Sequence, residues 1–342
     1  MCIRDRITGS NSVSANASNI QINELISGGS GGVNLTATND IKQKSGLQKA
    51  VSSTGAITLE GANIGEASNR LNVSSPEAIN ANATAGSVHL NGADDSVTFG
   101  KITATENIDL SSNGDIVMNN DLTTTGGYIR VESGRGLAIS NSMTASGDVT
   151  IVAQEVINQT SGSIVSTDGN VVVSNTTGDI TLNDIGAEQG SINVTANAGN
   201  INMIGDTTAG SNITLDSKTG NVALSALMHA TGGNIVINAG RDITQDAATD
   251  VSLKTDGTIT LTAGNNIGSQ DSKIDVQAGG KVDVTASTGS VNINSVNKDI
   301  SFGTIAAGTN IDISSTGADA GNISFTNDLN ANGYINLSLI HI

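Results

Sequence analysis

The sequence predicts an all-β protein that folds as a β-solenoid, and two observations carry this prediction. The first is a short phrase of glycine, a small polar residue, and then an aliphatic, a polar or neutral, and an aliphatic residue. The second is the regular spacing of these phrases along the chain. The phrase recurs almost without interruption at residues 169–173, 178–182, 190–194, 199–203, 210–215, 220–224 and 233–237.

The sequence numbers of the first aliphatic positions in these phrases increase by 9, 12, 9, 12, 9 and 13. The repeat is therefore about 21 residues long and has two unequal halves, a period in the range of solenoid proteins. Aliphatic residues at i and i+2 indicate half-buried strands, for which valine, isoleucine and threonine are suited. A helix is excluded, because each glycine costs about 1 kcal/mol there and no stripe of period 3.6 offsets it.

Glycine followed by asparagine, aspartate or serine is also typical of a hairpin turn, which gives an antiparallel meander. The alternation of 9 and 12 argues against the meander, since only a coil that closes on itself must return each residue type to the same place one turn later. We therefore expect glycine at tight corners between the faces of the coil. The polar residue after it can bond the backbone at the bend, so stacked coils should form a polar ladder along one edge.

Composition agrees with this fold and limits the function. The 342 residues include 41 glycines and 1 proline, with 3 phenylalanines, 2 tyrosines and no tryptophan, so the core must be narrow and aliphatic. The formal net charge of −17 disfavours nucleic acid as a partner, because that binding depends on lysine and arginine facing phosphates. A helix that crosses a bilayer needs an apolar run of about 18 residues or more, and none is present, so we expect no membrane-spanning segment.

The two tips have a separate origin in our interpretation. Residues 1–6 read as ATGTGTATAAGAGACAG, and residues 337–342 read as the reverse complement of that string, which resembles a transposon end used to tag sequencing libraries. We expect both to be translated adapter and exclude them from the fold. The expected organisation is then an irregular or partial first coil over 7–31 and a continuous parallel β-helix over 32–336. We expect the native ends, and any signal peptide, to lie outside this sequence.

The sequence also contains a second, longer repeat in addition to the repeat of about 21 residues. Four segments recur in the same order, which indicates that a module of several coils was duplicated. Their sequence numbers differ by 202 for the first two pairs and by 203 for the last two. The pairs are 40–43 and 242–245, 55–59 and 257–261, 63–65 and 266–268, and 71–73 and 274–276.

These segments, with the pattern Asp-Ile-x-Gln, Gly-x-Ile-Thr-Leu and Asn-Ile-Gly, resemble the repeat region of filamentous haemagglutinin-type surface adhesins of Gram-negative bacteria. The resemblance covers roughly residues 32 to 337. It implies a right-handed parallel β-helix, whose coils we expect to hold about 20–23 residues. It also implies two-partner secretion through an outer-membrane transporter, display at the bacterial cell surface, and attachment to a receptor or glycan of a host or neighbouring cell.

Aspartates at strand starts are the first candidate for chemistry. Carboxylates in a column between coils suit Ca²⁺, which prefers several oxygen ligands. However, asparagine or serine fills the same position in neighbouring coils, so we predict turn capping and no metal site. The aspartates concerned are Asp115, Asp148, Asp179, Asp242 and Asp299.

The nearest approach to a catalytic cluster is Asp94 and Asp95, close in sequence to His89 and Lys101. Parallel β-helices host polysaccharide lyases and hydrolases, whose carboxylates act as acid and base. No second, remote carboxylate pair accompanies this one, so we interpret the acids as loop residues, and His229 as a surface residue.

The sequence therefore predicts no enzyme, no catalytic residues, no cofactor and no metal ion. It favours a structural or adhesive stalk segment of a secreted bacterial adhesin or exoprotein. The alternative is a carbohydrate-active β-helix enzyme.

Overall fold

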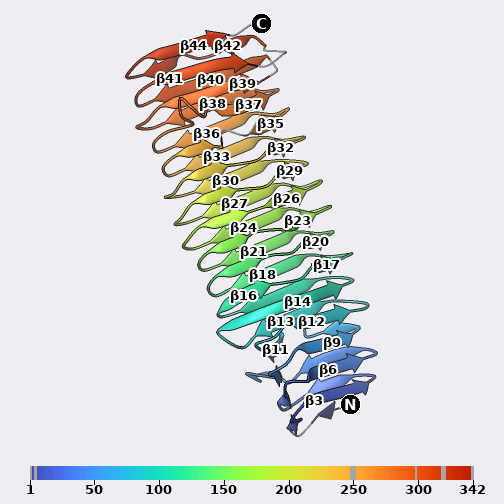
Figure 1. The fold of residues 1–342 in the computed structure, drawn as a ribbon. Coiled ribbons are helices and arrows are strands. Elements are labelled where there is room, and N and C mark those ends of the chain that lie inside the picture. The colour runs from blue at the N-terminus through green and yellow to red at the C-terminus, as the bar shows by residue number, and fades with distance from the viewer. Residues whose placement is uncertain (1, 4–5, 247–251, 297–298, 317–320, 340–342) are drawn as a thin grey trace. The chain divides into compact units, whose positions relative to one another are not determined.

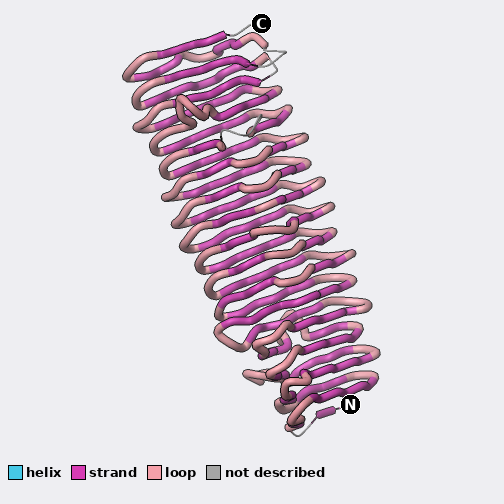
Figure 2. Tube along the Cα trace, in the orientation of Figure 1, coloured by secondary structure: helices cyan, strands magenta, loops and turns pink. Residues whose placement is uncertain are grey.

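The computed structural model describes residues 2–3, 6–246, 252–296, 299–316 and 321–339, and every regular element in these ranges is a β-strand (Figures 1 and 2). The chain divides into two units, Met1–Thr167 and Asp168–Ile342. Within each unit, strands pair in parallel with strands of the next coil. The predicted all-β parallel solenoid is confirmed.

In the first unit, the strands fall into two sets by hydrogen bonding. One set contains β1 (Cys2–Ile3), β2 (Ile7–Thr8), β4 (Ile20–Ile22), β5 (Ile26–Gly28), β7 (Asp40–Gln43), β8 (Val51–Ser53), β10 (Asn63–Ile64), β11 (Leu71–Ser74), β13 (Val88–Gly92), β15 (Ile108–Ser112), β18 (Ile129–Ser133) and β21 (Val149–Ala153). The other contains β3 (Ser12–Ala17), β6 (Gly32–Ala37), β9 (Ile57–Gly61), β12 (Ile79–Ala83), β14 (Ser96–Ala104), β16 (Asp115–Met118), β17 (Leu122–Thr124), β19 (Leu137–Ile139), β20 (Met143–Ala145), β22 (Ile157–Gln159) and β23 (Ser163–Ser166).

The second unit also has two sets of strands. One contains β24 (Val171–Asn175), β27 (Ile192–Ala196), β30 (Ile213–Ser217), β33 (Ile235–Ala239), β36 (Ile259–Ala263), β38 (Lys281–Ala286), β40 (Ile300–Ala307), β42 (Ile323–Phe325) and β43 (Leu329–Ala331). The other contains β25 (Ile180–Leu182), β26 (Asp184–Ala187), β28 (Ile201–Met203), β29 (Thr207–Ala209), β31 (Val222–Leu224), β32 (Met228–Ala230), β34 (Ile243–Gln245), β35 (Leu253–Thr255), β37 (Ile274–Ala278), β39 (Val291–Val296), β41 (Ile311–Thr316) and β44 (Ile335–Leu339).

The repeated phrases form the strands and the core as the period-2 pattern predicts. In β27 and β30, Ile192 pairs with Ile213 and Val194 with Leu215, and all four side chains are fully buried. The residues between them face outward. Each coil thus places aliphatic side chains directly over those of its neighbour, which buries them in a continuous stack.

Glycine occupies the corners because there is no room for a side chain. A Cβ on Gly190 would lie 2.0 Å from the backbone oxygen of Gly169, and one on Gly199 would lie 1.9 Å from that of Gly178. Gly199 also has φ of +143°, which residues with a side chain rarely adopt. The close approach of one coil to the next is therefore the main reason for glycine here.

The polar residue after the glycine builds the predicted ladder. In the second unit, the backbone N–H of the polar residue in one coil donates to Oδ1 of the equivalent Asp or Asn in the preceding coil, at 2.8 to 3.0 Å. The ladder joins Asp179, Asn200, Asn221, Asp242 and Asn266. Aspartate and asparagine serve equally, since only an acceptor oxygen is needed at each rung.

Parallel pairing begins earlier than the expected boundary at residue 32. Strand β3 pairs with β6 along its whole length, and β4 pairs with β7. Val13 and Ile20 are already buried, so the polar residues of the segment 7–31 lie on its outward positions. Of the two tips interpreted as adapter, residues 1, 4, 5 and 340–342 lie outside the described residues.

The duplicated module repeats its irregularities as well as its strands. The register of β12 against β14 shifts between Ile79 and Ala81, and that of β38 against β40 shifts between Val282 and Val284, which correspond at the offset of 203. After each shift the longer strand pairs with two shorter ones: β14 with β16 and β17, and β40 with β42 and β43. The duplication therefore extends beyond the segments detectable in the sequence.

Candidate functional site

The aspartates at strand starts act as turn caps. Asp115 Oδ1 accepts a hydrogen bond from Gly136 N at 2.9 Å, and Asp299 Oδ1 accepts one from Asn322 N at 2.6 Å. Asp179 and Asp242 belong to the ladder already described, and the backbone oxygen of Asp148 accepts from β18. The capping prediction is confirmed for the four aspartates whose side-chain bonds are described. Within the described ranges, no three His, Cys, Asp or Glu side chains gather to hold a metal ion.

The acids and bases that are close in sequence around residue 94 have different partners in space. Asp94 pairs with Lys49 at 2.6 Å, and Asp95 is exposed. Lys101 is exposed on β14 and lines an open hollow of about 560 Å³. Strand β14 belongs to one set of strands, whereas β13, which carries His89, belongs to the other. No described contact joins these groups into one cluster.

His229 lies half-buried on β32, in register with Lys254 of the next coil. Burial lowers the pKa of His229, and the positive charge of Lys254 lowers it further against the opposing effect of Asp256. The side chain is therefore a neutral surface imidazole at neutral pH, in keeping with the expected surface position.

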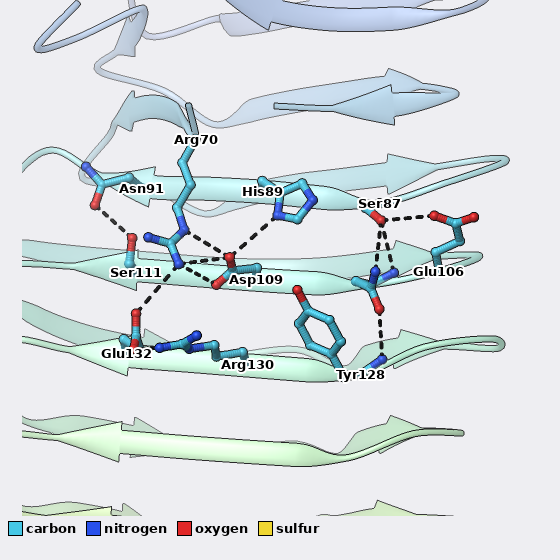
Figure 3. Close-up of polar contacts among 11 residues, drawn as sticks. Arg70, Ser87, His89, Asn91, Glu106, Asp109, Ser111, Tyr128, Arg130 and Glu132 are labelled. Atoms are coloured by element: carbon cyan, nitrogen blue, oxygen red, sulfur yellow. Dashed lines mark hydrogen bonds and ion pairs between the residues drawn. The ribbon is translucent and has the colours of Figure 1, made fainter. Parts of the chain in front are cut away.

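The strongest cluster in the first unit centres on Asp109 of β15 (Figure 3). Asp109 faces outward yet is only 4% exposed, because Arg70 covers it from a side loop two coils earlier. Arg70 Nη2 donates to both carboxylate oxygens, at 2.7 and 2.8 Å, and Nε donates to Oδ2 at 3.2 Å. His89 Nδ1 lies 3.5 Å from Oδ2, and Glu132 Oε2 lies 3.6 Å from Arg70 Nη2.

The charges in this cluster fix the ionisation of its central carboxyl. Burial by itself raises the pKa of Asp109, since a charged group loses hydration. The close approach of His89, together with the hydrogen bonds and the charge of Arg70, outweighs burial and holds the pKa of Asp109 below its ordinary value. Asp109 is therefore an ionised anchor for the guanidinium at neutral pH.

The loop that carries Arg70 is an insertion in one face of the solenoid. Strands β10 and β11 both pair with the single strand β13: Ile64 lies opposite Val88, and Leu71 lies opposite Leu90. The intervening segment 65–70 leaves the face. Gly65 permits this departure, with φ of +71° and no space for a Cβ.

The second unit contains an equivalent loop. Ile267 and β37 both pair with the single strand β39, and segment 268–273 leaves the face at Gly268, where φ is +65°. Lys273 at its end donates from Nζ to Asp312 Oδ1 at 2.8 Å and to Ser314 Oγ at 3.2 Å. Lys273 corresponds to Arg70, and Asp312 to Asp109, at the same offset of 203. The cation–carboxylate clamp is therefore present in both copies of the module.

Each clamped loop borders a shallow polar groove, and the two grooves share six corresponding lining positions. Their volumes are about 280 Å³ in the first unit and about 260 Å³ in the second. The corresponding lining residues are Gln43 and Gln245, Asn69 and Ser272, Arg70 and Lys273, Asn72 and Asp275, Asn91 and Asn294, and Ser111 and Ser314.

Sequence reasoning did not single out the members of these clamps. Arg70 and Asp109 are far apart in sequence and belong to no local motif, and the same is true of Lys273 and Asp312. The signal that could have found them is the offset of 203, extended along the module to charged residues.

No family model, curated protein or solved structure matches this chain. Among the described residues, none belongs to a helix with the length and hydropathy needed to cross a membrane.

Proposed function

We propose that this chain is a structural and adhesive stalk segment of a secreted bacterial surface adhesin or exoprotein, which mediates attachment or projects a distal module. Display at the cell surface and passage through an outer-membrane transporter belong to the same proposal. The partner at the far side is a receptor or glycan on a host or neighbouring cell.

The observation that supports this proposal is the even stacking of coils within each unit. Strands β27, β30 and β33 keep one register over three coils, with every residue of each strand paired to the next. Each coil of about 21 residues adds about 4.8 Å of stack. Because each coil contacts chiefly its neighbours, such a stack lengthens without a change of design.

The first test is location on the cell. Antibodies raised against the purified chain are applied to intact cells of the source organism, before and after treatment with an external protease. We expect labelling of intact cells that the protease removes. Labelling that appears only after permeabilisation would contradict the proposal.

The second test is the DNA on either side of this sequence, read by long-read sequencing. We expect a signal peptide and secretion domain upstream and further coils downstream. A short open reading frame with acidic loop insertions would favour the carbohydrate-active β-helix enzyme instead.

A further inference from the structure

The two side-loop grooves share a hydrogen-bonded column of outward polar residues. In the first unit, Asn91 Nδ2 donates to Asn72 Oδ1 and Ser111 Oγ donates to Asn91 Oδ1, both at 2.9 Å. Asn91 thus uses one of its two N–H groups and one lone pair, and keeps one of each. The column is fixed in place by its own bonds, with polar atoms still available at the groove.

The second unit repeats this column. Asn294 Nδ2 donates to Asp275 Oδ1 at 2.6 Å, and Ser314 Oγ donates to Asn294 Oδ1 at 3.0 Å. Asn294 Nδ2 also donates to Thr316 Oγ1 at 2.8 Å, so both N–H groups of this amide are engaged, unlike those of Asn91. These positions correspond to those of the first column at the module offset of 203. The polar column, the side loop and the clamp are therefore repeated together with the module.

The only two tyrosines of the sequence stand at equivalent places three coils beyond the two side loops, and neither is a lining residue of a groove. Tyr128 and Tyr334 each precede a strand three coils after the side loop, and the N–H of each donates to an asparagine Oδ1 at 3.1 Å. Both residues are exposed, Tyr128 by 36% and Tyr334 by 48%. Figure 3 shows Tyr128 on the same face as Asp109, with its hydroxyl directed toward it. Tyr334 Oη accepts from Gln270, which lines the second groove.

From this arrangement we propose that the two side-loop grooves are equivalent binding sites for a neutral oligosaccharide, one in each copy of the module. Fixed amides and hydroxyls match the alternating donors and acceptors of sugar hydroxyl groups. An exposed tyrosine offers the electron-rich face on which the C–H side of a sugar ring packs.

The charges of the grooves favour a neutral ligand. In the first, the positive charge of Arg70 is taken up by Asp109, at 2.7 Å. In the second, Asp271 and Asp275 line the groove beside Lys273, which is itself bound to Asp312. An anionic sugar would meet repulsion in the second groove, so uncharged hydroxyl recognition is the chemistry common to both.

This inference deepens the proposed adhesive role and rests on it for its biological setting. The purified chain is titrated calorimetrically with neutral oligosaccharides, namely cellohexaose, xylohexaose, mannopentaose and chitopentaose, and with heparin and hyaluronan fragments as the anionic set. We expect at least one neutral oligosaccharide to bind with two sites per chain. Absence of binding by the neutral set, or binding by the anionic set alone, would overturn the inference.

Variants assign the sites. Tyr128→Ala and Tyr334→Ala should each weaken one site at least tenfold and leave one intact, and the double variant should lose both. Asn91→Ala should weaken the first site alone. Asn202→Ala, an outward asparagine on β28 away from both grooves, is the matched control. Equal melting temperatures show that the variants fold, and unchanged affinity in the folded double tyrosine variant would refute the sites.

The two proposals can fail separately. Binding by the purified chain without surface labelling of cells would contradict the adhesin proposal and leave the grooves as sugar sites. Surface labelling of cells without oligosaccharide binding would refute the proposal that the grooves bind sugars and would leave the adhesin proposal standing.

Discussion

The clamp between Arg70 and Asp109 gives the sharpest prediction of stability. Asp109→Asn keeps the shape of the side chain but removes its charge, and leaves the guanidinium without its main counter-ion. Losing one partner of a fully buried ion pair costs about 3–5 kcal/mol. The Arg70 side chain is 27% exposed and keeps Glu132 Oε2 within 3.6 Å, so the cost here is smaller. We expect about 2 kcal/mol, or about 30-fold in the equilibrium for opening the side loop.

Native-state hydrogen exchange is the appropriate assay, because it reports local opening. Amides of segment 65–70 and of β13 should exchange about 30-fold faster in Asp109→Asn than in the unmodified chain. Asp95→Asn, an exposed acid near the same strand, is the control and should leave both regions unchanged.

The pH dependence provides a second, independent measure of the same clamp. The pKa of Asp109 is lowered in the folded chain, so the folded state binds fewer protons than the unfolded state as pH falls past the ordinary value of 3.8. The stabilising contribution is therefore complete above pH 3.8 and disappears as pH falls through the lowered pKa. The difference in exchange rate between the unmodified chain and Asp109→Asn should therefore vanish at a pH below the lowered pKa of Asp109. Equal exchange rates at neutral pH, or a difference that persists in strong acid, would refute the reasoning.

Three further predictions follow from the core, the corners and a surface histidine. Ile201→Ala removes a fully buried side chain and should lower the unfolding free energy by about 2–5 kcal/mol, whereas the neighbouring outward change Asn202→Ala should alter it by less than about 0.5 kcal/mol in urea unfolding. Gly199→Ala should destabilise far more than Gly46→Ala in the same measurement. Both positions have positive φ, at a cost of about 1–2 kcal/mol, but only the first also places a Cβ 1.9 Å from a backbone oxygen. Because the pKa of His229 is lowered, protonation favours unfolding as pH falls below 6.5, so His229→Asn should flatten the loss of stability below that pH; an unchanged melting-temperature profile would contradict it.

The short repeat was sufficient to predict the coil. In the phrase 199–203, glycine sets the corner, Asn200 caps the turn, and Ile201 and Met203 face inward, and each of these roles is found in the structure. Each of these roles depends on residues close in sequence and on the next coil having the same pattern. Local pattern and periodicity therefore contain the information.

Contacts between coils add to the local pattern at residues 7–31 and around residue 94. The polar composition of 7–31 predicts an irregular or partial first coil, and Val13 and Ile20 already follow the inward period there. Sequence reasoning interprets Asp94 and Asp95 as loop acids, and no local pattern indicates that the neighbour of His89 is Asp109, one coil away. In a solenoid, two side chains at the same position on successive coils lie side by side on one face. They are often closer in space than residues only a few positions apart in sequence.

The solenoid, its inward and outward positions, its capping ladder and the duplication of a module could all be predicted from the order of residue types. These features follow from the alternation within a strand, the repeat of one coil and the longer offset of the module, and all three can be read from the order of residue types. Which outward side chains contact each other became known from the folded chain alone. The clamps of Arg70 with Asp109 and of Lys273 with Asp312 join positions that no local motif connects. Their contact depends on how far a side loop extends from the face and on how the next two coils stack. A local sequence pattern predicts neither of these.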